Sequence, residues 1–222
     1  MQEYIPIVIS YLLTNTPTNA EDNGVFIEQD GLVVIEAEST RSNLDEWLEK
    51  TQVSGFTGAS YIEFTGNSPL NGPPSSPLEY TFSINRGGLY FFHMHVARET
   101  VEINGETRTD VANDGFIRLD GDYGEGPNAG DSHGDHAPLA NLKEDTKYFG
   151  GNDNRFVWAT GNRLDLGGHN NKRVPVYDLK AGETYTFVLH GRSQLFKVDR
   201  FVFRHEDERS SDAQDLSRTE TR

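Results

Sequence analysis

The sequence predicts an all-β protein, an antiparallel β-sandwich of the jelly-roll type with long loops and at most one short helix. Three observations lead to this class. Short runs of alternating apolar and polar residues recur along the chain, and Gly, Asn, Asp or Pro residues bound these runs. The 222 residues also include 22 Gly, and 11% of the residues are aromatic. Such a mixture favours strands and turns over helices.

The individual strands can be assigned from this alternation. The clearest is Leu78–Ile84, which alternates over seven positions, and the alternating run Leu89–Arg98 follows it after a short turn. We expect these two runs to pair as a hairpin. The pattern at Ser42–Lys50 resembles a short helix with an N-cap and acids in its first turn. Further strands are expected at Leu32–Glu38, Ser60–Thr65, Phe116–Leu119, Phe156–Ala159, Val174–Leu179, Tyr185–Leu189 and Phe196–Phe203.

A chain of this length and composition fits one domain between two flanking segments. Residues 1–24 contain the apolar run Tyr4–Leu13, which resembles a truncated secretory signal without its basic start, or else a linker or peripheral strand. Residues 25–204 are expected to form the sandwich. Residues 205–222 contain six acids, three Arg and a single Leu, and this composition predicts a disordered acidic tail. We expect a secreted or extracellular protein.

Charge and composition exclude several classes of function. The formal net charge is −15, which opposes binding to nucleic acid, because such binding depends on clustered Lys and Arg. The chain has no Cys, so disulfides, thiolate metal sites and cysteine nucleophiles are excluded. No apolar run approaches the roughly 20 residues that cross a bilayer, so we expect no membrane partner.

The longest polar stretch is Asp120–Asn154, which is rich in Gly, Asn, Asp and His. Long loops on a rigid sandwich are where binding sites usually lie. The charge is uneven here: residues 99–154 carry a formal charge of −9, from thirteen acids and four basic residues, and residues 155–204 carry +5, from nine basic residues and four acids. The basic segment suggests that an anionic ligand is possible.

Four short motifs resemble those of carbohydrate-binding modules of families 6 and 35. Their order along the chain also matches, and the resemblance covers about residues 31–204. The motifs are Val34–Ser39, Gly88–Tyr90, Val174–Tyr185 and Gly191–Phe203. The resemblance implies a non-catalytic jelly roll that binds polysaccharide and is appended to a polysaccharide-degrading enzyme. Two features depart from the family pattern: the loops between 120 and 173 are longer, and the ligand-binding tyrosine has no clear counterpart.

The resemblance also implies a structural calcium ion held by Glu36, Glu38 and Asp199. Two glutamates at positions i and i+2 of a strand point to one face, and Ca²⁺ binds several hard oxygens. The alternative is that both glutamates face solvent. A second oxygen cluster, Asp120–Glu125, lacks the Glu that a helical calcium loop has at its twelfth position.

A sugar site needs a flat apolar surface and planar or forked hydrogen-bonding groups. Trp158 is the expected stacking platform, and the alternative is that it belongs to the core. Tyr123, His133 and His136 on the polar loop are further candidates, which could also be solvated loop residues. We expect Trp47 to cover the end of the sandwich. The polar contacts are expected from Asn162, Arg163, Asp165, His169, Asn170, Lys172 and Arg173.

A second class of function is a cupin-like, metal-dependent enzyme. His93 and His95 lie on one face of a predicted strand, and Glu99 follows four residues later, as in a site for Fe, Mn or Zn. The simpler interpretation places both His on the sheet surface. We therefore expect calcium-stabilised polysaccharide binding that targets an associated glycoside hydrolase or lyase to an algal or plant polysaccharide. A red-algal galactan, and hence an agarase as the associated enzyme, is the specific hypothesis.

Overall fold

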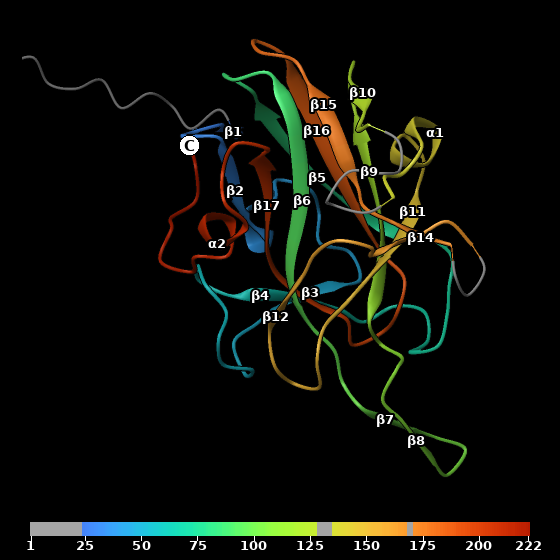
Figure 1. Ribbon diagram of the computed structural model, residues 1–222. Helices are drawn as coiled ribbons and strands as arrows, with labels where there is room; N and C mark the ends of the chain where they lie inside the picture. Colours follow the sequence, from blue (N-terminus) through green and yellow to red (C-terminus); the bar gives the residue numbers. More distant parts are fainter. Residues whose placement is uncertain (1–23, 128–134, 168–170) are drawn as a thin grey trace, which may run out of the picture.

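The structure is a computed structural model, and it describes residues 24–127, 135–167 and 171–222. The described strands form two large sheets and one small separate hairpin (Figure 1). Sheet A contains, in spatial order, β1 (Val25–Ile27), β5 (Ser75–Ser83), β16 (Thr184–Gly191), β9 (Asp114–Asp120), β11 (Thr146–Phe149), β13 (Leu164–Asp165) and β14 (Lys172–Arg173). Its pairs are antiparallel except β1 with β5.

Sheet B is entirely antiparallel and contains the first and last strands of the family-like motifs. Its order is β10 (Gly124–Glu125), β15 (Val176–Leu179), β6 (Gly88–Ala97), β17 (Lys197–His205), β4 (Tyr61–Phe64) and β3 (Trp47–Lys50). In addition, β12 (Val157–Ala159) pairs with β6, and β2 (Leu32–Glu36) pairs with β17. The separate hairpin is β7 (Val101–Ile103) with β8 (Glu106–Arg108), and the short helices are η1 (Ala37–Ser39), α1 (Leu139–Leu142) and α2 (Ser210–Ala213).

The core lies between the inner faces of the two sheets. On β6, the face predicted to be apolar is fully buried, from Tyr90 to Val96 at every second position. On β5, Leu78, Tyr80 and Phe82 face it in the same way. The predicted β-sandwich is confirmed, and its core is built by the strand alternation itself.

The predicted hairpin between the runs at 78–84 and 89–98 is wrong. Strand β5 pairs with β16 in sheet A, and β6 pairs with β17 in sheet B, so the turn between them carries the chain from one sheet to the other. Both strands have large apolar side chains on one face. Placing them in opposite sheets lets the two faces pack against each other across the core.

The predicted helix at residues 42–50 is also wrong, because its second half forms β3. This strand pairs with β4, and the side chain of Trp47 is fully buried against Phe64, with 5.1 Å between the ring centroids. The indole N–H donates to the Ser76 carbonyl at 2.9 Å. Trp47 therefore closes the core, as expected for a cover on the sandwich, and tertiary packing overrides the local helical pattern.

The C-terminal segment is ordered, contrary to the predicted disordered tail. Residues 206–222, called the C-terminal strap, include α2 and run back along β2 to the end of the chain (Figure 1). The Thr221 N–H donates to the Val34 carbonyl, and the Thr221 hydroxyl accepts from the Val34 N–H, both at 3.0 Å. The composition gave no sign of this because the segment is held by hydrogen bonds to β2, Arg200 and Trp158 and by the single buried side chain of Ala213, and none of these contacts requires an apolar-rich sequence.

Among the described residues, no helix has the length and apolar character needed to cross a membrane.

Candidate functional site

A row of registered side chains crosses the outer face of sheet A, the face that points away from the core. From β16 to β14 it consists of His190, Phe116, Lys147, Asp165 and Lys172, each opposite the next on the neighbouring strand. Directly opposed residues lie on the same side of a sheet. Their neighbours along each strand point into the core instead, so the row forms a polar face with one aromatic ring in it.

Two hollows flank the ion pair at the centre of this row, and we call them together the outer groove. The first has a volume of about 320 Å³ and contains Phe149 and Asp114. The second has a volume of about 400 Å³ and contains Phe116 and Arg192. Lys147 and Asp165 line both hollows, and their side chains are 2.7 Å apart at the boundary between them.

The aromatic rings of the outer groove differ in their surroundings. Over the ring of Phe149 lie two cations: the Lys172 ammonium is 4.7 Å and the Arg163 guanidinium 5.4 Å from its centroid. Such contacts fix both cations to the ring. Phe116 is half-buried in the second hollow, which makes it the better platform for an incoming apolar surface.

The charged side chains of the outer groove are paired with one another. Arg192 donates to both carboxylate oxygens of Asp114 at 2.7 and 2.8 Å, and Arg118 donates to Asp145 at 2.8 Å. Burial raises the pKa of Asp165, but hydrogen bonds from Lys147 and from the Gly167 N–H outweigh it and give a net lowering. The groove therefore offers fixed donors and acceptors of both signs.

The structure brings three of the expected ligand residues together at this groove, namely Arg163, Asp165 and Lys172. Asn162 is exposed on the turn before Arg163, and Arg173 is half-buried on β14. His133, His169 and Asn170 lie outside the described residues.

Trp158 lies far from this groove, on the outer face of sheet B. Its ring packs against His95 at 4.8 Å between centroids, and its indole N–H donates to the Gln214 carbonyl of the strap at 3.2 Å. The side chain is half-buried and joins a small apolar cluster with Val202 and Ala213. Its surroundings are those of a packing residue between sheet B and the strap, whereas the alternative to the sugar platform had placed it in the core.

Tyr123 and His136 are likewise buried. The Tyr123 side chain is 3% exposed, and its hydroxyl donates to the carbonyls of Leu119 and Leu142 at 2.6 and 3.0 Å. The His136 ring packs edge-on against Phe91. Neither ring presents a face to a polysaccharide in this arrangement.

Sequence reasoning missed Phe116, Lys147, Phe149 and Arg192 in the outer groove. A signal was present for the two aromatic rings. On β9 the alternation assigns Ile117 and Leu119 to the core, so Phe116 falls on the polar face. On β11, Phe149 falls on the polar face for the same reason, because Tyr148 points to the core. The sequence signal for such a ring is therefore an aromatic residue at a strand position that the alternation places on the polar face.

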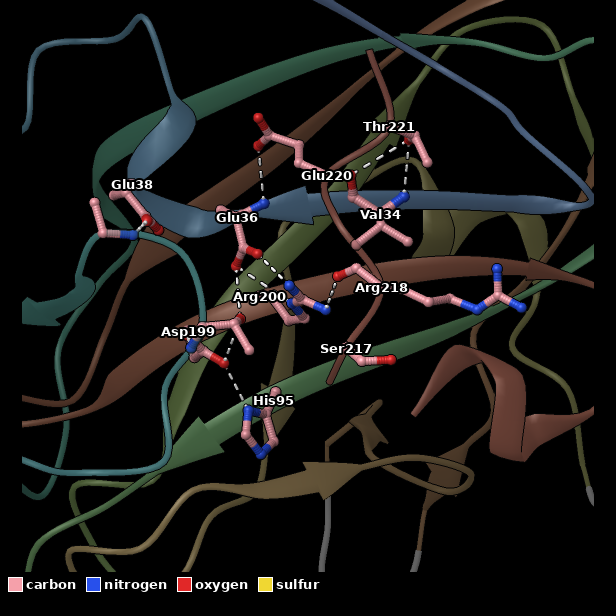
Figure 2. Close-up of polar contacts among 12 residues, drawn as sticks. Val34, Glu36, Glu38, His95, Asp199, Arg200, Ser217, Arg218, Glu220 and Thr221 are labelled. Atoms are coloured by element: carbon pink, nitrogen blue, oxygen red, sulfur yellow. Dashed lines mark hydrogen bonds and ion pairs between the residues drawn. The ribbon is translucent and has the colours of Figure 1, made fainter. Parts of the chain in front are cut away.

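The three acids expected to bind calcium do come together, at one end of sheet B (Figure 2). They meet at the loop around Thr57, whose hydroxyl donates to Glu36 at 2.9 Å and whose N–H donates to Asp199 at 2.8 Å. Glu38 accepts from the N–H groups of Ala59 and Ser60 at 2.7 and 3.2 Å.

A β-bulge in β17 helps to assemble this cluster. The register shifts between Val198 and Arg200, so that Asp199 and Arg200 together occupy the place opposite His95. Arg200 forms an ion pair with Glu36, and Asp199 lies 2.7 Å from the His95 Nδ1 atom. An extra residue at a bulge redirects side chains in this way.

The donor atoms of the cluster suit a hard cation in type. Burial raises the pKa of Glu38 to about 7, and the nearby charge of Glu36 raises it in the same direction. The second carboxylate oxygen of Glu38 is buried and has no hydrogen-bond partner. Burial also raises the pKa of Glu36, against the effect of Arg200. Within the described residues, however, no three His, Asp or Glu side chains surround one point as metal ligands. The cluster thus has oxygen donors and excess negative charge, with Arg200 as one internal cation.

The residues of the cupin-like hypothesis do not converge. His93 accepts a hydrogen bond from Arg204 at 3.2 Å, His95 lies against Asp199, and Glu99 binds Lys197 at 2.8 Å. Both His are 3% exposed, so they are also not the sheet-surface residues that the simpler interpretation predicted. They lie on the outer face of β6 but are buried, because the Trp158 ring of the neighbouring strand β12 packs against both His and the strap lies over this face.

Comparison with known proteins gives structural neighbours only. No protein-family model matches the chain, and no curated protein matches it. Similar solved structures include the Podospora anserina GH26-CBM35 β-(1,4)-mannanase, with 15% identity, a TM-score of 0.46, and coverage of 82% of this chain and 29% of that one. A family 35 carbohydrate-binding module from Clostridium thermocellum has 15% identity, a TM-score of 0.44, and coverage of 78% and 98%.

A third neighbour is a cycloisomaltooligosaccharide glucanotransferase from Paenibacillus sp., with 13% identity, a TM-score of 0.44, and coverage of 80% of this chain and 19% of that chain. This chain spans less than a third of the mannanase and of the glucanotransferase.

Proposed function

We propose that this protein binds carbohydrate at the outer groove of sheet A without catalysing a reaction. The observation that carries the proposal is the groove itself, where half-buried aromatic rings lie among fixed ionic donors and acceptors. Aromatic rings cover the apolar faces of pyranose rings, and each sugar hydroxyl can both donate and accept a hydrogen bond. The two hollows lie along neighbouring strands, which are about 5 Å apart, so the groove suits a short stretch of an oligosaccharide.

The sharpest test of the site is Phe116→Ala, with Leu48→Ala as the matched control. Leu48 is 49% exposed on β3 in the other sheet, so its truncation removes apolar surface away from the groove. Affinity electrophoresis against a panel of algal and plant polysaccharides should show binding by the wild type and the control. Phe116→Ala should bind about tenfold more weakly, because a lost apolar contact of about 1.4 kcal/mol corresponds to that factor. Equal binding by the three proteins would exclude Phe116 from the site.

Calcium binding at Glu36, Glu38 and Asp199 is part of this proposal. The ion would compensate the excess negative charge of the cluster and join β2 to β17, which is a structural role. Calcium at 100 times its dissociation constant stabilises a native protein by about 2.7 kcal/mol, or about 5–11 °C in Tm for a domain of this size.

The calcium test compares melting curves of metal-free protein with and without added Ca²⁺. Glu38→Gln should abolish the response, and Glu49→Gln, an exposed glutamate on β3, should retain it. Identical melting curves for the wild type in EDTA and in Ca²⁺ would exclude a calcium ion.

The biological setting is proposed from the sequence motifs. Modules of families 6 and 35 accompany polysaccharide-degrading enzymes, so we infer a secreted protein that delivers a glycoside hydrolase or lyase to an algal or plant polysaccharide. A red-algal galactan is the first ligand to test, and an agarase is the associated enzyme that such a ligand suggests.

A further inference from the structure

The outer groove contains several cations, so its charges bear directly on which glycans it accepts. Algal and plant polysaccharides divide into uncharged polymers and polymers with sulfate or carboxylate groups. A sulfate-binding or carboxylate-binding site needs cations whose charge is available to the ligand. The surplus of basic residues between 155 and 204 suggested that such cations exist.

Two of the three cations that line the groove, Lys147 and Arg192, are instead paired with carboxylates of the same sheet. Lys147 and Asp165 face each other in register and lie 2.7 Å apart, with both side chains largely buried. Arg192 donates hydrogen bonds to both carboxylate oxygens of Asp114, whose side chain is 7% exposed. An anionic group that approached either cation would therefore meet a carboxylate within a few ångströms, and that carboxylate cannot move away without breaking a held ion pair.

The contacts of the remaining cations and the net charge of the whole chain also disfavour the binding of an anionic glycan. Lys172 and Arg163 are directed onto the ring of Phe149, and Lys172 also lies opposite Asp165 in the register of β13 and β14. The chain has a net charge of −15, which repels a polyanion at long range. Paired charges still hydrogen-bond to neutral hydroxyls, because a carboxylate has further lone pairs and an ammonium has further N–H bonds.

We propose that the outer groove selects uncharged glycans and discriminates against sulfated and uronate-rich ones. This inference rests on the proposed carbohydrate-binding function and specifies its ligand class. Within it, Asp165 is the residue that determines specificity, because it neutralises Lys147 and lies opposite Lys172. If a red-algal galactan is the ligand, an agarose-type neutral chain is expected and a sulfated chain is not.

The test uses pairs of polymers that differ in charge: agarose with carrageenan, and highly methyl-esterified pectin with its de-esterified form. Affinity electrophoresis at low ionic strength should show binding to the neutral member of at least one pair, with the charged member bound at least tenfold more weakly. Because the repulsion is electrostatic, 0.5 M NaCl should narrow this gap.

Asp165→Asn separates selectivity from binding. It frees Lys147 from its carboxylate and should narrow the neutral-to-charged ratio at least fivefold. Asp178→Asn, the same change at an exposed site on β15 in sheet B, should leave the ratio unchanged. A charged polymer bound as tightly as its neutral partner, or an Asp165→Asn ratio equal to that of the control, would overturn the selectivity while carbohydrate binding stood. Failure of the wild type to bind any member of either pair would overturn the selectivity, and failure to bind the whole panel of algal and plant polysaccharides would overturn carbohydrate binding as well.

Discussion

The C-terminal strap offers the most direct test of the structure, because a buried hydroxyl group near its end accepts a hydrogen bond from β2. The Thr221 side chain is buried at 6% exposure, and its oxygen accepts the Val34 N–H at 3.0 Å. Val34 lies on β2, whose other edge is already paired with β17, so this N–H has no second route to a partner within the sheet. Thr221→Val keeps the shape of the side chain and removes the acceptor.

The variant leaves the buried Val34 N–H without a hydrogen-bond acceptor, which lowers the free energy of unfolding by about 1–3 kcal/mol. For a domain of this size, 1 kcal/mol corresponds to about 2–4 °C in Tm, so a loss of about 2 kcal/mol lowers Tm by about 4–8 °C. The matched control is Thr219→Val, the same substitution two residues earlier at an exposed position of the strap.

Thermal and urea unfolding, followed by circular dichroism, measure both variants against the wild type. We expect the control to lie within about 0.5 kcal/mol of the wild type, as is usual for surface changes. If Thr221→Val were as stable as Thr219→Val, the hydrogen bond from the Val34 N–H to the Thr221 hydroxyl would be contradicted.

Two further predictions concern residues beneath the strap. Trp158→Ala should lower the stability by about 2 kcal/mol or more, because it removes a ring packed on His95 and a hydrogen bond to Gln214, yet glycan binding by the folded variant should match the wild type. Burial, with the nearby Arg204 charge, lowers the pKa of His93 to about 3, below its usual 6.5, so this residue contributes stability above pH 6.5 that is lost as the pH falls toward 3. Protonation of His93 should therefore lower the free energy of unfolding of the wild type by up to about 1.4 kcal/mol per pH unit. In urea unfolding, the difference in this free energy between the wild type and His93→Gln should shrink steadily between pH 6.5 and 4. A constant difference would show that His93 takes up protons equally in the folded and unfolded states.

The positions of the longer strands were predictable from the sequence, although β3 was predicted as helix and β11 as loop, but the partners of the strands were not predictable. Alternation reports only which face of a strand is apolar, and both β5 and β6 fulfil their pattern whether they pair with each other or face each other across the core. The strap was missed for a related reason. Its stability depends on the edge of a strand about 187 residues earlier, and composition contains no information about that edge.

For the candidate site, the sequence identified charged residues better than aromatic ones. Arg163, Asp165 and Lys172 were recognisable because charged side chains cluster there between short strands. Trp158 was chosen because it is an aromatic residue close in sequence to these polar residues, but its strand β12 pairs with β6 in the other sheet. Phe116 was treated as an ordinary strand residue and Phe149 as part of the polar loop, although their positions within β9 and β11 place both on the polar face.

At the carboxylate cluster, the spacing of core residues along the strand also indicates a local irregularity of that strand. The core residues are Phe196 directly before β17 and Val198, Phe201 and Phe203 within it, so the spacing is two, then three, then two. A regular strand keeps a spacing of two throughout, and a single step of three requires one extra residue, which is a β-bulge. The step falls at Asp199 and Arg200, the two residues that the bulge turns toward Glu36 and His95. The sequence therefore contained evidence for the bulge that brings the acids together. The pairing of Arg200 with Glu36 does not follow from that spacing, because it also requires β2 to lie beside β17, and this is a property of the strand order.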